Sequence, residues 1–176
     1  MKRNLTVWQI SGFIFTGVLG VILHFVFDWT NQSVIVAPFV PVNESVWEHL
    51  KLLFYPMLVF SYIQSRDIGK EYENFWCVKR IGILFGILLV PLLFYTINAI
   101  FKSVPDWVNI LIYFVSVAGT YYLEVRLFNN KLNCNKSSAI VVLAIIFVLF
   151  VLFTFFTPDI DLFKDPITGT YGYHGI

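Results

Sequence analysis

Long apolar runs alternate with short polar segments along the chain, and this pattern predicts a bundle of membrane-spanning helices. A helix needs about 20 mostly apolar residues to cross a bilayer. Five segments meet this requirement, at about 5–27, 45–64, 80–101, 107–128 and 139–157. Pro56 lies in the middle of the second segment and frees the carbonyl of Leu52 from its helical hydrogen bond. Pro91 lies in the middle of the third segment and should kink that helix in the same way. The predicted fold class is all-α, a polytopic membrane bundle of five transmembrane helices in one domain over 1–157.

Composition supports a membrane protein and excludes other classes. Hydrophobic residues make up 58% of the 176 residues, charged residues make up 13%, and the mean hydropathy is +0.76. These values lie outside the range of ordinary soluble domains. The net charge is only +1, so the chain lacks the basic surface that nucleic-acid binding requires.

The distribution of Lys and Arg predicts the orientation. With the N-terminus inside, nine of the 12 basic residues fall on the cytoplasmic side, as the positive-inside rule requires. Five spans then place the C-terminus outside, and 158–176 becomes an extracytoplasmic polar tail. This tail carries Asp159, Asp161 and Asp165, and its turn-forming residues indicate a solvated strip that could fold back as a lid. Cys77 and Cys134 both fall on the reducing side, so no disulfide is predicted.

The stretch PVNESVWEHLKLLFYP, at 41–56, concentrates ionisable residues at the start of the second span. A charged side chain in lipid costs at least about 2.5 kcal/mol, so a cluster of them requires a compensating role. His24 and Asp28 lie at the same depth on the first span. We therefore predict one outward-opening polar pocket, and its candidate residues are His24, Asp28, Glu44, Ser45, Glu48, His49, Lys51, Tyr55, Tyr95 and Asn98.

The residue types allow three interpretations of this cluster. A divalent metal ion could take nitrogen from His24 and His49 and oxygen from Asp28 or Glu48. A cation, amine or headgroup could bind in the acidic mouth instead. In the third interpretation the residues are structural, since Ser45 and Glu48 match a capping box and Glu48 and Lys51 are spaced as an i,i+3 pair.

The last span, 139–157, differs from the others in having almost no polar residues. Thr154 is the single polar side chain before its end. We interpret this segment as lipid-facing packing without a chemical role.

Two stretches carry a resemblance to a known family. These are Val42–Lys51 followed by Tyr55-Pro56, and the ending Leu162-Phe-Lys-Asp-Pro-Ile-Thr-Gly-Thr-Tyr-Gly172. The chain resembles a family of small uncharacterised bacterial integral membrane proteins over essentially its whole length. The resemblance implies a five-helix fold in a bacterial cell membrane, and it implies no established activity.

The leading functional hypothesis is that the pocket binds a small ligand or ion, for transport or sensing. An alternative is an intramembrane metal-dependent hydrolase or transferase that acts on a lipid or lipid-linked substrate. A third is an accessory subunit of a membrane complex. The partners implied are the lipid bilayer, a small-molecule, ion or lipid ligand, and a membrane protein or a second copy of the chain.

Overall fold

The computed structural model describes residues 4–101, 103–130, 132 and 134–173. Within these ranges the chain forms five α-helices and a short 3₁₀ helix, and no β-strand. The helices are α1 (Leu5–Trp29), α2 (Val46–Asp67), α3 (Phe75–Ile100), α4 (Asp106–Phe128) and α5 (Lys136–Phe155), and the 3₁₀ helix η1 covers Asp161–Phe163. The predicted all-α fold class is confirmed.

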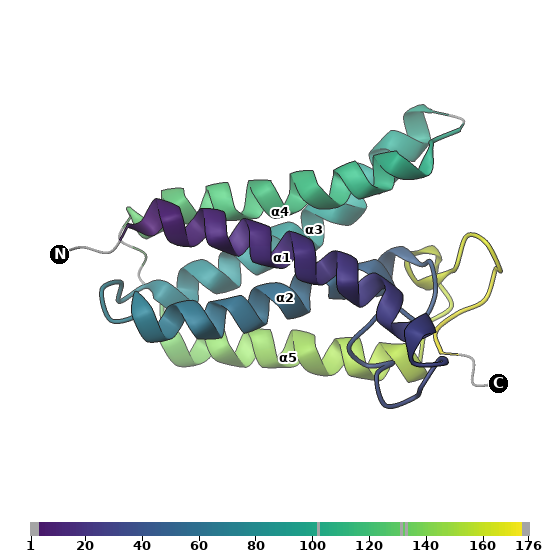
Figure 1. Ribbon diagram of the computed structural model, residues 1–176, viewed down its shortest axis with the longest axis horizontal. Helices are drawn as coiled ribbons and strands as arrows, with labels where there is room; N and C mark the ends of the chain where they lie inside the picture. Colours follow the sequence, from purple (N-terminus) through teal and green to yellow (C-terminus); the bar gives the residue numbers. More distant parts are fainter. Residues whose placement is uncertain (1–3, 102, 131, 133, 174–176) are drawn as a thin grey trace.

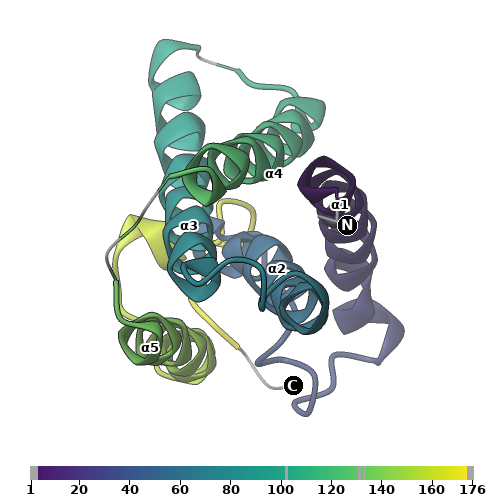
Figure 2. The same ribbon diagram turned by 90° about the vertical axis from the view of Figure 1, so that its left-hand side faces the viewer.

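Helix α2 is the centre of the bundle. Figure 2 shows α2 between α1, α3 and α5, while α4 lies against α1 and α3. Twelve residues of α2 are buried, against four of α5. The helices lie along the long axis of the molecule, and the two termini are at opposite ends (Figure 1). We call these the N-terminal end and the C-terminal end of the bundle.

Four of the helices, α1, α3, α4 and α5, are long and apolar enough to cross a membrane. Helix α2 is similar in length, but its polar and charged residues keep it out of this group. Its central position explains the difference, because side chains enclosed by other helices do not face lipid. A multi-pass membrane protein is therefore compatible with the fold, and a membrane crossing by α2 stays a prediction.

The helices extend further into the polar connections than the apolar runs indicate. Helix α2 continues to Asp67, and α3 begins at Phe75 where we expected Arg80. Packing accounts for the earlier start of α3, because Phe75, Cys77 and Val78 are buried and tertiary contacts supply most of the stability of a helix.

The prediction that the chain has no disulfide was wrong. Cys77, in the first turn of α3, is bonded to Cys134 in the connection before α5, with a Cα–Cα distance of 6.1 Å. The prediction rested only on the expected location of both cysteines on the reducing, cytoplasmic side. It could not anticipate that the fold brings together two cysteines 57 positions apart.

The carbonyl that Pro56 leaves without a helical partner is satisfied by another helix. The Tyr113 hydroxyl of α4 lies 2.8 Å from the carbonyl oxygen of Thr16 and 3.2 Å from that of Leu52, and it donates between them. A Cβ atom at residue 20 would meet the same hydroxyl, so Gly20 is what lets Tyr113 reach both carbonyls. One phenol thus joins α1, α2 and α4 at mid-bundle.

Replacing Tyr113 by Phe should therefore destabilise the protein. The change leaves two buried carbonyls without this donor, at a cost of about 1–3 kcal/mol. Unfolding monitored in detergent measures it, and Tyr122→Phe on the exposed face of α4 is the matched control. In a Pro56→Ala background the cost should shrink, because residue 56 then donates to Leu52 itself. An equal cost in both backgrounds would contradict the assignment.

Candidate metal-binding site

The start of α2 is positioned by hydrogen bonds from its own first turn and from the preceding loop. Ser45 is the N-cap, and its hydroxyl accepts the backbone N–H of Glu48 at 3.3 Å. The N–H of Ser45 is bound by the side chain of Asn43 at 2.9 Å. The Glu48 carboxylate therefore does not complete the predicted capping box. It accepts the N–H of Val42 at 3.0 Å and points into the bundle.

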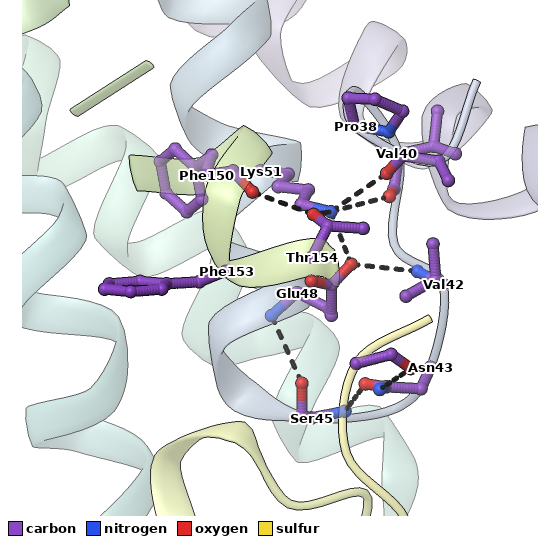
Figure 3. A network of polar contacts seen from close by, with 12 residues as sticks. Pro38, Val40, Val42, Asn43, Ser45, Glu48, Lys51, Phe150, Phe153 and Thr154 are labelled. Atoms are coloured by element: carbon purple, nitrogen blue, oxygen red, sulfur yellow. Dashed lines mark hydrogen bonds and ion pairs between the residues drawn. The ribbon is translucent and has the colours of Figure 1, made fainter. Parts of the chain in front are cut away.

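Lys51 is fully buried and is the centre of a polar network (Figure 3). Its ammonium lies 2.5 Å from the Glu48 carboxylate and 2.7 Å from the Thr154 hydroxyl. It also lies 3.0 Å and 3.2 Å from the carbonyl oxygens of Ala37 and Val40. The network ties the α1–α2 loop, α2 and α5 together at the C-terminal end.

Two features of this network bear on the sequence predictions. The i,i+3 pairing of Glu48 with Lys51 is confirmed. The interpretation of 139–157 as packing without a chemical role was wrong at Thr154, which is buried and binds Lys51. A lone hydroxyl in an otherwise apolar helix was the available signal. Tyr55 supports the same loop, because its hydroxyl donates to the carbonyl of Pro38 at 2.7 Å.

Next to this network, three potential metal ligands from different segments come together. His24 lies near the end of α1, Glu44 just before α2, and His49 in the first turn of α2. One ligand atom from each lies within 4.8 Å of the others. The two imidazole rings are 5.2 Å apart between centroids, and His49 Nε2 is 3.4 Å from Glu44 Oε2.

Hydrogen bonding leaves one nitrogen of each ring suited to a metal. His49 Nδ1 lies 2.9 Å from the carbonyl oxygen of Ser45, which can only accept, so Nδ1 carries the proton and Nε2 faces Glu44. Such a backbone partner is the usual outer-shell support of a metal-binding histidine. His24 Nδ1 is buried and has no hydrogen-bond partner. Two nitrogens and one carboxylate are the protein ligands of one class of catalytic zinc site.

The charges around the three residues favour a cation. When His49 Nε2 also carries a proton it donates to Glu44, and this hydrogen bond holds the pKa of Glu44 below its ordinary value of 4.5, although burial opposes the shift. Asp165 lies close enough to act on Glu44, and Asp28 close enough to act on His24. Two further carboxylates therefore add negative charge near the site.

Comparison with known proteins places the chain in a family. The sequence profile of DUF6512, described as a family of unknown function, matches residues 1–173. The chain belongs to this family. Its resemblance to an uncharacterised family, predicted from the two sequence stretches, is thereby confirmed. Comparison with curated proteins and with solved structures found no match.

The predicted pocket residues separate into groups in this family member. Glu44, and not Asp28 or Glu48, is the carboxylate grouped with the two imidazoles. Glu48 and Lys51 bind each other, and Ser45 is the cap. Tyr95 and Asn98 lie elsewhere, on the end of the α3–α4 hairpin that splays away from α1 and α2 in Figure 1.

The residues after α5 pack against the start of α2. Phe163 packs against Trp47 with the two rings tilted and their centroids 4.7 Å apart, and Asn43 donates to the carbonyl of Gly172 at 3.1 Å. Asp165 is buried and accepts two backbone N–H groups of its own turn, whereas Asp159 and Asp161 are exposed. The tail therefore braces the segment that carries Glu44. A covering role as a lid stays a prediction.

A groove of about 410 Å³ lies apart from the three metal-ligand candidates. It runs between α1 and α4, and apolar residues line it: Phe13, Ile14, Gly17, Val18, Val21, Ile22 and Phe114. None of the predicted pocket residues lines this groove.

Removing the buried ammonium should be severely destabilising. Lys51→Met leaves the Glu48 carboxylate buried without its cation, and breaking a buried pair from one side costs about 3–5 kcal/mol. Unfolding in detergent measures the loss, with Lys70→Met at an exposed position as the matched control. Adding Glu48→Leu to Lys51→Met should restore much of the stability. A Lys51→Met protein as stable as the control would contradict the network's role.

Proposed function

We propose that this protein is a multi-pass membrane protein that binds a divalent transition-metal ion, for transport or sensing, through His24, Glu44 and His49. The observation that supports this proposal is the approach of three ligand atoms, from two helices and a loop, to within 4.8 Å of one another.

The geometry fits zinc better than it fits calcium or magnesium. Ligand atoms about 2.0–2.1 Å from a tetrahedral zinc are separated by roughly 3.4 Å. His49 Nε2 and Glu44 Oε2 have that separation, 3.4 Å. Two imidazole nitrogens also favour transition metals, because Ca²⁺ and Mg²⁺ select oxygen ligands.

An ion pair between His49 and Glu44 explains only part of this arrangement. It does not explain why His24 presents a second imidazole to the pair, with a buried nitrogen that has no hydrogen-bond partner. Placing two imidazoles together is unfavourable when both are protonated, and a bound cation removes that cost by displacing the protons.

Metal content of the purified protein tests the proposal. Elemental analysis should give one zinc per chain after equilibration and dialysis. His24→Ala and His49→Ala should each weaken binding by more than about 100-fold, beyond the usual effect of outer-shell changes. Glu44→Gln should also weaken binding. Its matched control is Glu71→Gln, which changes an exposed acid at the other end of the bundle. Wild-type protein that retains no stoichiometric metal would refute the proposal.

The pH dependence of binding identifies the ligands. Because the pKa of Glu44 is lowered, its carboxylate stays ionised through the weakly acidic range and does not limit binding there. The imidazoles limit metal binding in this range, because an ordinary histidine titrates near about 6.5 and must be neutral to bind metal. Zinc affinity, measured by competition with a chromophoric chelator, should therefore fall with pH as the imidazoles take up protons, before the carboxylates are protonated. Affinity that falls only below about pH 4 would point to carboxylates alone.

For the membrane arrangement we propose that α2 also crosses, with the N-terminus inside. Support comes from the similar length of α2 and from the nine basic residues that this orientation places inside. The metal site then lies on the outer side. In this orientation the disulfide between Cys77 and Cys134 lies at the inner end, where the cytosol reduces such bonds, so the disulfide favours the opposite orientation and the labelling experiment below decides between the two.

Cysteine labelling in intact cells tests the orientation. In a Cys77→Ser/Cys134→Ser background, Ile167→Cys, at a position 78% exposed in the tail, should react with a membrane-impermeant maleimide. Lys70→Cys, at the other end, should react only after the cells are opened. The reverse pattern would invert the orientation and would place the disulfide on the oxidising side.

A further inference from the structure

A second polar cluster lies at the N-terminal end of the bundle, away from the metal-ligand candidates. Helices α1 to α4 each contribute one residue to it. These residues are Gln9 at 3% exposure, and Gln64, Lys79 and Glu124 at 0%. We call these four residues the inner polar layer.

Packing contacts place three of these residues at one depth, and the ion pair with Glu124 places Lys79 beside them. Phe60 of α2 and Tyr121 of α4 both contact α1 at Gly12. Gln64, Glu124 and Gln9 each lie about one helical turn from these positions, displaced toward the N-terminal end. The side chain of Gln9 faces the Glu124 carboxylate.

The charged members of the layer form a buried ion pair in an aromatic enclosure. Lys79 Nζ lies 2.6 Å from Glu124 Oε2. The same ammonium is 5.3–5.9 Å from the ring centroids of Phe75, Tyr121 and Phe128, within cation–π range. Gly82 lets the carboxylate lie against α3, since a Cβ there would be 2.7 Å from Glu124 Oε1.

The layer also contains several polar atoms without a partner. The amide oxygen and nitrogen of Gln64 are buried and make no hydrogen bond, and Glu124 Oε1 and the Gln9 amide have no partner other than each other. Buried polar atoms in folded proteins are bound by protein groups or by water. A site with several such atoms around a charge offers water the two to four partners it needs.

We propose that the inner polar layer is an internal water-binding site through which Glu124 exchanges a proton with the aqueous phase at the N-terminal end. In this step a proton passes from hydronium to the Glu124 carboxylate, giving a carboxylic acid and a water molecule. Lys79 keeps its proton, and the three rings hold its charge while Glu124 is neutral. The titratable groups that face Glu124 are Lys79 from α3 and Tyr121 on its own helix.

A double-mutant cycle tests whether the layer holds water. In a dry layer, Gln64→Leu removes unpaired polar atoms and should raise the melting temperature. In a hydrated layer the same change removes a water ligand beside the ion pair, and we expect the melting temperature to fall by about 2–4 °C. In a Lys79→Leu/Glu124→Leu background the fall should disappear. A rise in the wild-type background would overturn the proposal.

Infrared difference spectroscopy of the full-length protein in lipid nanodiscs tests the proton exchange. Acidification should produce a protonated-carboxyl band that shifts in D₂O, that is absent in Glu124→Gln, and that remains in Glu48→Gln, the other buried glutamate. A band that persists in Glu124→Gln, or the absence of any such band, would overturn the proposal. If Glu124→Gln does not fold, loss of the band in Glu48→Gln would overturn it equally. Neither experiment depends on metal binding, so failure here leaves the metal proposal standing.

Discussion

The buried ammonium of Lys51 is the constraint on which the C-terminal end of this structure depends. A lysine in an apolar interior is unfavourable unless oxygen atoms surround it, and here they come from Glu48, Thr154 and two loop carbonyls. Because these oxygens belong to three separate segments, the network requires the α1–α2 loop, α2 and α5 to be in place together. The metal-ligand candidates lie beside it, and His49 shares the first turn of α2 with Glu48.

The central position of α2 accounts for the distribution of polarity in the protein. The surrounding helices expose apolar side chains and bury the few polar ones that meet α2 or each other, while α2 carries buried charges near one end and the Gln64 amide near the other. A helix enclosed by protein can be polar without contacting acyl chains. The same enclosure makes each polar group depend on a partner from another helix. The Leu52 carbonyl, freed by Pro56 and bound by Tyr113, shows this dependence at mid-bundle.

The prediction from sequence succeeded where neighbouring residues decide the outcome. The Ser45 cap, the Glu48–Lys51 pair and the all-helical class follow from spacing within a turn and from apolar runs. It failed or fell short where distant residues meet. Asp28 and Glu48 were the predicted carboxylate ligands of the metal, while Glu44 was predicted only as a pocket residue, and no local rule separates the three. Only the packed structure shows that the Glu48 carboxylate is bound by the Val42 N–H and the Lys51 ammonium. Glu44 is then the carboxylate that faces His49.

By itself the sequence determined which segments are helical and that ionisable residues concentrate at the end of the first helix and the start of the second. Both properties depend only on short stretches of chain. Tertiary structure alone decided which imidazole meets which carboxylate, that Thr154 binds Lys51, and that Cys77 joins Cys134. These contacts join residues as many as 103 positions apart. Their geometry depends on how the helices pack around α2, and that packing is a property of the whole chain.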